Sequence, residues 1–200
     1  MDYEVLDNHD GELMPTLENR HHVIRMIREW DADIVITCRP NDYHPDHRNT
    51  SILVQDAAYL VAVPNILSSV PALEKNPLFL YVRDSFTRPN PFTPDITVDI
   101  TSVYNKKIDG FDAHESQFYE WLPWIDKVSD QVPSNLAERK KWLAEYYTET
   151  ITSEMRKSLE KWYGNSYAAQ VKQAEAFEIC EYGMRPTDVD IRRLFPMLKD

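Results

Sequence analysis

The residues with the most chemical potential lie in one short stretch, RPNDYHPDHRNT, at positions 39–50. It contains two histidines, two aspartates, two arginines and two prolines, so it offers metal ligands and proton-transfer groups but nothing for a core. Pro45 fixes its own φ and disfavours helix for the residue before it, which predicts an extended His44 and a helix start at the proline. His47 then lies in the first helical turn, so one imidazole can bind a metal while the other faces a substrate.

Asp46 stands between the two histidines and can accept a hydrogen bond from one ring, which would fix the tautomer and raise the basicity of that imidazole. The helix amino terminus adds unpaired N–H groups and partial positive charge, which favour a developing oxyanion. The alternative is an ordinary solvated helix start, because histidines three residues apart are common. Two imidazoles are also too few for a catalytic zinc site, which generally takes three protein ligands and a water.

The elements around this stretch place it where a site is expected. Thr16 is a predicted N-cap for a helix with apolar residues at 23, 26, 27 and 30, and residues 34–38 (IVITC) form a continuously apolar run typical of a strand buried on both faces. A helix is predicted over residues 51–63, strands over 78–82 and 96–100, and a helix from 102 toward 119. The histidines therefore follow the carboxyl end of a strand, where open α/β sheets bind ligands.

The carboxyl-terminal third has a different pattern. Ser134 is a predicted cap of one long helix that reaches Gly164, with Leu143, Ile151 and Leu159 in its apolar stripe, and a last helix is predicted over residues 168–180. Alternating helix and strand over the first 120 residues favours an open α/β sheet, followed by a helical carboxyl-terminal extension.

Composition excludes several classes of partner. The chain has 200 residues and a net charge of −11, which would repel nucleic acid, and it contains no apolar run long enough to span a membrane. Cys38 and Cys180 do not make a disulfide framework or a metal knuckle, and the first residues lack the pattern of a signal peptide. We therefore expect a cytoplasmic protein with no nucleic-acid or membrane partner.

Three segments resemble one family. ITCRPNDYHPDHRNTSILVQDAAYLV, at positions 36–61, resembles the second metal motif of the PIG-L/LmbE-type deacetylases. DNHDGEL at 7–13 is similar to their D-G-x-L loop, and KIDGFDAHESQFYEW at 107–121 to their K-x-x-A…H-x-S-Q helix, with Gly110 where alanine is usual. The resemblance implies a Rossmann-like, mostly parallel LmbE-like sheet. It covers about residues 5–122, so we predict a partial α/β deacetylase domain at 1–122 and a helical extension at 123–200 packed on it.

The resemblance also implies an activity. Members of the family are zinc-dependent hydrolases that remove N-acetyl groups from N-acetylglucosamine-type compounds. By this resemblance His47 is the metal ligand. His44 polarises the acetamide oxygen or protonates the departing amine, and Asp46 orients it.

Four further residues are weaker candidates for substrate contacts. His114 matches the H-x-S-Q motif but is equally consistent with a helix-packing histidine. Asp10 matches the D-G-x-L loop and could touch a sugar hydroxyl, although an aspartate before Gly11 is also an ordinary turn residue. Arg39 and Asp42 could line the mouth of the pocket or form a surface pair.

One half of the family's site has no match in this sequence. The A-H-P-D-D-E motif, which supplies two zinc ligands and the general base, is absent, so the enzyme assignment is uncertain for this chain alone. We expect the chain to be an N-terminally truncated fragment of a hydrolase. The alternative is a complete, non-catalytic sugar- or protein-binding homologue. Because the family's first strand is also missing, its sheet would have an exposed edge, which a partner or another copy in a homo-oligomer would cover.

Overall fold

A computed structural model describes residues 3–198 of the chain. Its first helix, α1 (Leu17–Glu29), begins as predicted, because the Thr16 hydroxyl accepts a hydrogen bond of 3.2 Å from the N–H of Asn19. Strand β1 (Ile34–Thr37) follows and leads to α2 (Pro45–Leu60). His44 is the N-cap of α2 with φ −83° and ψ 132°, which confirms the predicted extended residue and the helix start at Pro45.

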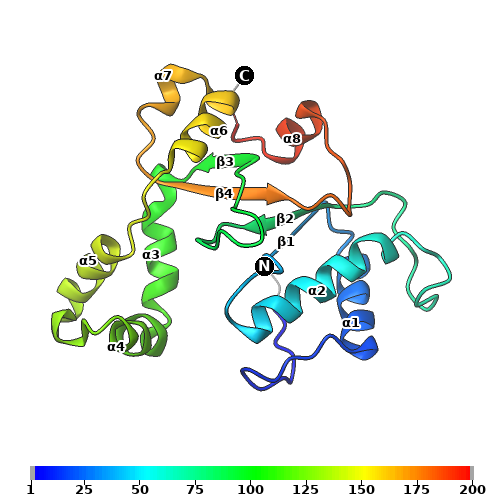
Figure 1. The fold of residues 1–200 in the computed structure, drawn as a ribbon, viewed down its shortest axis with the longest axis horizontal. Helices are drawn as coiled ribbons and strands as arrows, with labels where there is room; N and C mark the ends of the chain where they lie inside the picture. The colour runs from blue at the N-terminus through cyan, green and yellow to red at the C-terminus, as the bar shows by residue number, and fades with distance from the viewer. Residues whose placement is uncertain (1–2, 199–200) are drawn as a thin grey trace. The chain divides into compact units, whose positions relative to one another are not determined.

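The remaining elements are named in chain order in Figure 1. The strands are β2 (Leu78–Val82), β3 (Ile96–Asp99) and β4 (Ala174–Ile179), and the helices are α3 (Tyr104–Asp112), α4 (Leu122–Ile125), α5 (Leu136–Tyr146), α6 (Ser153–Tyr163), α7 (Asn165–Ala168) and α8 (Asp188–Leu194). Short 3-10 turns lie at Thr101–Val103 and Ser129–Gln131, and a π-helical segment lies at Ser116–Trp121.

The strands form an open sheet in the order β1-β2-β4-β3. β1 pairs in parallel with β2, from Ile34 opposite Leu78 to Thr37 opposite Tyr81. β2 pairs antiparallel with β4, from Leu80 opposite Ile179 to Val82 opposite Phe177. The predicted open α/β sheet is therefore present, and its parallel pairing joins the strand that precedes the histidine motif to the next strand along the chain.

β1 is less enclosed than its sequence predicted. We expected a strand buried on both faces, but Ile36 is 49% exposed and, of the four residues of β1, only Thr37 is buried. The reason is position: β1 is at the edge of the sheet, so one of its sides has no neighbouring strand among the described residues.

Two predictions for the carboxyl-terminal part are wrong. Residues 174–179 form strand β4 rather than part of the helix expected over 168–180, because pairing with β2 outweighs the helix propensity of alanine and glutamate. The long helix expected from Ser134 to Gly164 is two helices, α5 and α6. Asn135 caps the first, and Thr152 caps the second by accepting from the N–H of Met155 at 3.2 Å.

The chain divides into two compact units. The first contains the described residues up to Thr97 and from Ala176 onward, and the second contains residues 98–175. This boundary differs from the one at residue 122, which rests on sequence resemblance and stays a prediction. Within the described residues, no helix is long and apolar enough to cross a membrane.

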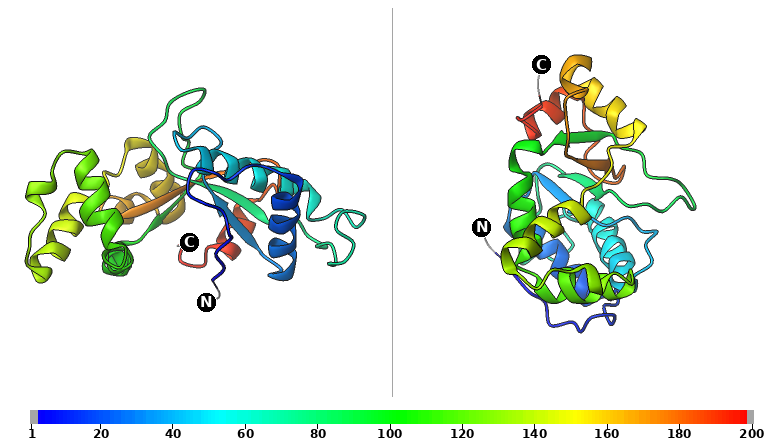
Figure 2. Two further views of the ribbon diagram at one scale, coloured as in Figure 1. Left: turned by 90° about the horizontal axis from the view of Figure 1, so that it is seen from below. Right: turned by 90° about the vertical axis from the view of Figure 1, so that its left-hand side faces the viewer.

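Packing in the first unit fixes the helix that carries the site. α1 and α2 pack against each other (Figure 2), and their residues Ile24, Ile27, Val54 and Ala57 meet Phe79 of β2 in one buried cluster. In the second unit, Ile108, Tyr119 and Leu143 form a separate core with partly buried aromatic rings around them.

A buried arginine closes the carboxyl end of α2. Arg28 is 5% exposed and directs its guanidinium at backbone carbonyls rather than at a carboxylate. Its acceptors, at 2.7–3.3 Å, are the carbonyl oxygens of Leu60, Val61, Val63, Ile66, Leu67 and Val70. A cation at this end also complements the helix dipole.

Candidate active site

The histidine motif connects β1 to α2 at the carboxyl end of β1. The two imidazole rings lie close together, with centroids 4.9 Å apart. The His44 side chain is 26% exposed and that of His47 is 43% exposed, so both rings are accessible to a small molecule.

Asp42 organises the turn between strand and helix. Its Oδ1 accepts a hydrogen bond from the His44 backbone N–H at 2.9 Å and lies 3.0 Å from Nδ1 of His47. Arg48 donates to the carbonyls of Asp42 and Tyr43, both at 2.8 Å, and closes the turn from the helix side. The Asp42 carboxylate is largely enclosed, with 11% of its side chain exposed.

This contact decides the tautomer of His47. A carboxylate oxygen can only accept, so Nδ1 of His47 must carry the hydrogen. In the neutral ring, Nε2 then holds a free lone pair, and no described residue contacts Nε2 through a hydrogen bond. An imidazole held by a carboxylate at one nitrogen and free at the other is the usual form of a metal ligand.

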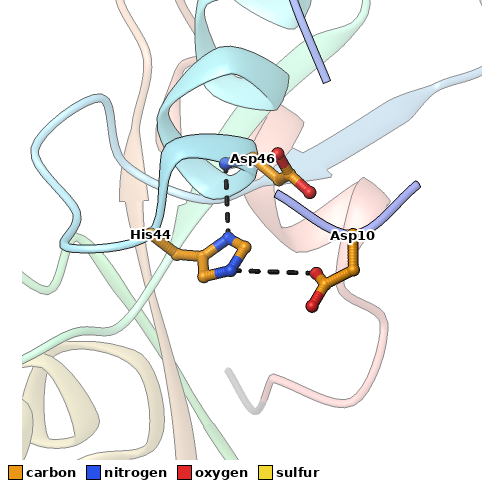
Figure 3. A group of neighbouring side chains, drawn as sticks. All are labelled: Asp10, His44 and Asp46. Atoms are coloured by element: carbon orange, nitrogen blue, oxygen red, sulfur yellow. Dashed lines mark hydrogen bonds and ion pairs between the residues drawn. The ribbon is translucent and has the colours of Figure 1, made fainter. Parts of the chain in front are cut away.

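His44 has the opposite arrangement. Its Nδ1 accepts a hydrogen bond of 3.3 Å from the backbone N–H of Asp46, so the neutral ring carries its hydrogen on Nε2. Figure 3 shows this second nitrogen turned toward Asp10, whose Oδ1 lies 3.7 Å away. The two histidines therefore present different groups: His44 presents a hydrogen-bond donor, and His47 presents a lone pair.

The sequence suggested that the Asp46 carboxylate orients the His44 ring, but the carboxylate contacts other groups. It accepts from the N–H groups of Gly11 and Leu13, at 2.7 and 3.2 Å, and so fastens the amino-terminal arm to the start of α2. Asn49 adds a second tie by donating to the Leu13 carbonyl at 2.6 Å. Asp46 holds His44 only through its backbone N–H.

The arm brings a third ligand-type group to the motif. Asp10 is almost fully exposed, and its carboxylate, the His44 ring and the Asp46 carboxylate place one ligand atom each within 4.8 Å of one another. These three residues form a possible metal site. The carboxylates have free lone pairs, but the His44 nitrogen that faces Asp10 is a donor in the neutral ring. The imidazole of the motif with a free lone pair is that of His47.

Arg39 lies inside the protein rather than at the mouth of a pocket. It is 3% exposed and pairs with Asp84 at 3.0 Å and with Glu178 at 3.8 Å. It also donates to the carbonyls of Phe86 and Asn90, at 3.4 and 2.7 Å. Arg39 thereby ties the histidine turn to the segment after β2.

Two other residues with ligand-type side chains are Cys38 and His114. Cys38 is half-buried, and burial together with the negative charges of Asp42 and Asp84 raises the pKa of its thiol, which disfavours a thiolate metal ligand. His114 belongs to the second compact unit and is exposed just before the π-helical segment, where its role in substrate binding stays a prediction.

Sequence reasoning named Asp42 only as a lining residue and did not find its contact with His47. The signal was present as an aspartate five residues before the second histidine, with a helix start between them. That spacing has no fixed geometry until the turn is built, so the contact needed coordinates.

Comparisons with known proteins agree with this motif. Residues 1–58 match the family model described as PIG-L, GlcNAc-PI de-N-acetylase. The chain is also 30% identical to a diacetylchitobiose deacetylase from Thermococcus kodakarensis over 138 residues, 62% of this chain and 48% of the relative. The chain is therefore similar to the PIG-L/LmbE-type deacetylases. It spans about half the length of the curated relative it matches.

Solved structures support the same fold. The N,N'-diacetylchitobiose deacetylase from Pyrococcus horikoshii aligns with a TM-score of 0.55 and 21% sequence identity. The alignment covers 91% of the present chain and 59% of the Pyrococcus protein. GalB, the 4-carboxy-2-hydroxymuconate hydratase from Pseudomonas putida, aligns with a TM-score of 0.51 and 17% identity over 86% of this chain and 60% of that one. Because proteins named for different reactions share this fold, the site must carry the functional argument.

Proposed function

We propose that this chain forms part of a zinc-dependent hydrolase that removes N-acetyl groups from N-acetylglucosamine-type sugars. The observation that carries the proposal is the opposite tautomers of the neighbouring histidines, imposed by Asp42 on one ring and by the Asp46 N–H on the other. Hydrolysis of an amide needs both an activated water and a proton donor for the leaving amine. The motif presents one group suited to each task.

His47 is the proposed zinc ligand, through Nε2. When bound, zinc would supply Lewis-acid activation of the attacking water. One imidazole does not hold a catalytic zinc alone, so the proposal requires further ligands. The carboxylates of Asp10 and Asp46 are of a suitable type, and others would come from sequence outside these 200 residues in a longer protein.

His44 is the proposed acid. In the neutral ring, its Nε2–H can donate a hydrogen bond to the acetamide oxygen while negative charge develops there. Transfer of a proton to the departing amine requires that the ring first take up a second proton; the imidazolium can then give one proton to the amine nitrogen and become neutral again. The N-cap contact with Asp46 keeps the hydrogen on this nitrogen in the neutral ring. Asp10, at 3.7 Å, would stabilise the ring when it is protonated.

Zinc titration by calorimetry and acetate release from N,N'-diacetylchitobiose together test these roles. We expect His47→Ala to lose both zinc and hydrolysis, and His44→Ala to keep zinc but lose hydrolysis. His21→Ala, on α1, is the matched control and should keep both. Zinc binding unchanged in His47→Ala would contradict the ligand role.

The same measurements separate the hydrolase from a binding protein that has lost the reaction. If the chain binds N-acetylated sugar without zinc and releases no acetate, the non-catalytic homologue is the correct description. About one zinc per chain with acetate release supports the hydrolase.

A further inference from the structure

Two tryptophans lie on the surface of the second compact unit. Trp121 ends the π-helical segment and Trp124 lies in α4, and these residues are 51% and 65% exposed. Their indole rings stack, with centroids 5.4 Å apart and planes inclined by 21° to each other. Because both residues are more than half exposed, each ring keeps an aromatic face open to solvent. The pair is therefore accessible to a ligand.

The tryptophans belong to one exposed stripe along the helix. Glu120 precedes Trp124 by four residues, and Trp121 precedes Ile125 by four, so each pair occupies neighbouring positions on the helical surface. Ile125 is 49% exposed and Glu120 is exposed. Tyr119 is buried in the core of this unit and attaches the helix to it, so the core does not require the stripe. We call Glu120, Trp121, Trp124 and Ile125 the tryptophan surface.

The ionisable groups around the tryptophan surface are mainly acidic. Residues 115–131 contain four carboxylates and one lysine, and all five side chains are exposed. Within the part of the chain that the structure describes, no hydrogen bond or ion pair engages the carboxylate of Glu120. An indole face attracts a cation through its quadrupole, and a free carboxylate attracts it through its charge. The surface therefore favours a cationic ligand.

An amino sugar combines the two properties that this surface selects. Its ring offers C–H groups to an aromatic face, and its amine carries a positive charge at slightly acidic pH. The corresponding N-acetylated sugar has the same ring, but its amide is neutral. A lysine-bearing peptide has the charge but lacks the sugar ring. Only the amino sugar uses both the indole faces and the carboxylate.

We propose that the tryptophan surface binds glucosamine units of a deacetylated or partly deacetylated oligosaccharide, with sugar rings against the indole faces and an ammonium group at Glu120. The proposal rests on the proposed function, because hydrolysis of the acetamide produces this amine. The surface would be a second carbohydrate-binding site, separate in sequence from the histidine motif, that prefers the product to the N-acetylated substrate. It would retain partly deacetylated oligosaccharides on the protein.

NMR titration of the indole N–H signals in metal-depleted buffer at slightly acidic pH tests the proposal. The probes are a fully deacetylated glucosamine tetramer, the N-acetylated tetramer and tetralysine. Zinc and turnover are not needed, so failure of the hydrolase proposal leaves this result readable. We expect the deacetylated tetramer to shift the signals of Trp121 and Trp124 and to bind about three- to tenfold more tightly than the N-acetylated one. The preference should weaken as salt is raised.

Variants assign that preference to the surface. Trp124→Ala should weaken binding of the deacetylated tetramer, whereas Trp30→Ala, which removes a 62% exposed tryptophan from the first unit, should not. Glu120→Gln should abolish the preference and leave the N-acetylated tetramer unaffected, and Glu74→Gln, at an exposed position of the first unit, is its control.

Three results would each overturn the proposal. The first is equal binding of the two tetramers, and the second is a preference that survives Glu120→Gln. The third is tetralysine that binds as tightly as the deacetylated tetramer, which would assign the surface to a basic peptide instead.

Discussion

Asp42 and His47 share a hydrogen bond of 3.0 Å that spans the turn between β1 and α2. The same carboxylate oxygen accepts the N–H of His44, so one side chain fixes the backbone of the first histidine and the tautomer of the second. The site therefore depends on a residue outside the HPDH string. This relationship, rather than histidine spacing, is what makes the two rings chemically different.

Asp42→Ala should weaken zinc binding about 10- to 100-fold, because His47 loses the acceptor that holds its hydrogen on Nδ1 and raises its basicity. The zinc affinity of Asp42→Asn should lie between those of Asp42→Ala and the natural protein, since the amide oxygen accepts a hydrogen bond but carries no charge. Asp130→Ala is the control, and calorimetric titration is the measurement. An Asp42→Ala protein with the natural zinc affinity would contradict this role.

Arg28→Met should lower the free energy of unfolding by about 3 kcal/mol or more, because it leaves several buried carbonyl groups without a donor. Arg25→Met on the same helix is the comparison. Its ion pair with Glu29 is 3.7 Å long and exposed, so we expect a loss of about 0.5 kcal/mol or less. Urea denaturation of both variants is the check, and similar losses would refute the carbonyl network as a source of stability.

Gly183→Ala and Gly110→Ala should change stability in opposite directions. A Cβ at Gly183 would overlap Cδ2 of Phe79 and lie 2.7 Å from the Pro77 carbonyl oxygen, so overpacking should cost about 1–3 kcal/mol. A Cβ at Gly110 meets nothing within 4 Å, and α3 should gain about 0.5–1 kcal/mol. Thermal unfolding measures both, and a stable Gly183→Ala protein would contradict the packing around Phe79.

Tyr147→Phe should reduce the loss of stability at alkaline pH. Burial, with the negative charges of Tyr146 and Asp126, raises the pKa of Tyr147 to about 12. The same residue ionises at about pH 10 in the unfolded chain. Its contribution to the free energy of unfolding is therefore complete below that pH and is lost as the pH rises toward 12. Its buried hydroxyl has no hydrogen-bond partner among the described residues, so phenylalanine should not destabilise the protein at neutral pH.

The control for that variant is Tyr3→Phe, since Tyr3 is 89% exposed. The free energy of unfolding, measured from pH 8 to 12, should decline less steeply for Tyr147→Phe than for the natural protein. For Tyr3→Phe the decline should match that of the natural protein. Identical curves for the two variants would show that Tyr147 ionises equally in the folded and unfolded chains.

Local signals in the sequence were enough to predict the elements that carry the site. Thr16 before an apolar stripe, the β-branched run at 34–37 and Pro45 after His44 each specify a conformation within a few residues. The first helix, the first strand and the start of the second helix are accordingly where the sequence placed them.

The failures depend on contacts between distant residues. Residues 174–179 contain strong helix formers, and only the pairing partner β2 makes them a strand. The contacts of Asp46 with Gly11 and Leu13 likewise join the arm to a helix more than thirty residues away. Neither contact produces a periodic pattern of residues, so neither could be predicted from a single sequence.

The most direct test of the account is the protonation of the two imidazole rings in the metal-free protein, read from their ¹⁵N shifts by long-range ¹H–¹⁵N NMR above pH 7.5. We predict hydrogen on Nδ1 of His47 and on Nε2 of His44. In Asp42→Ala, His47 should lose its preference for hydrogen on Nδ1. Hydrogen on Nε2 of His47, or on Nδ1 of His44, would contradict the division of roles from which the proposed chemistry follows.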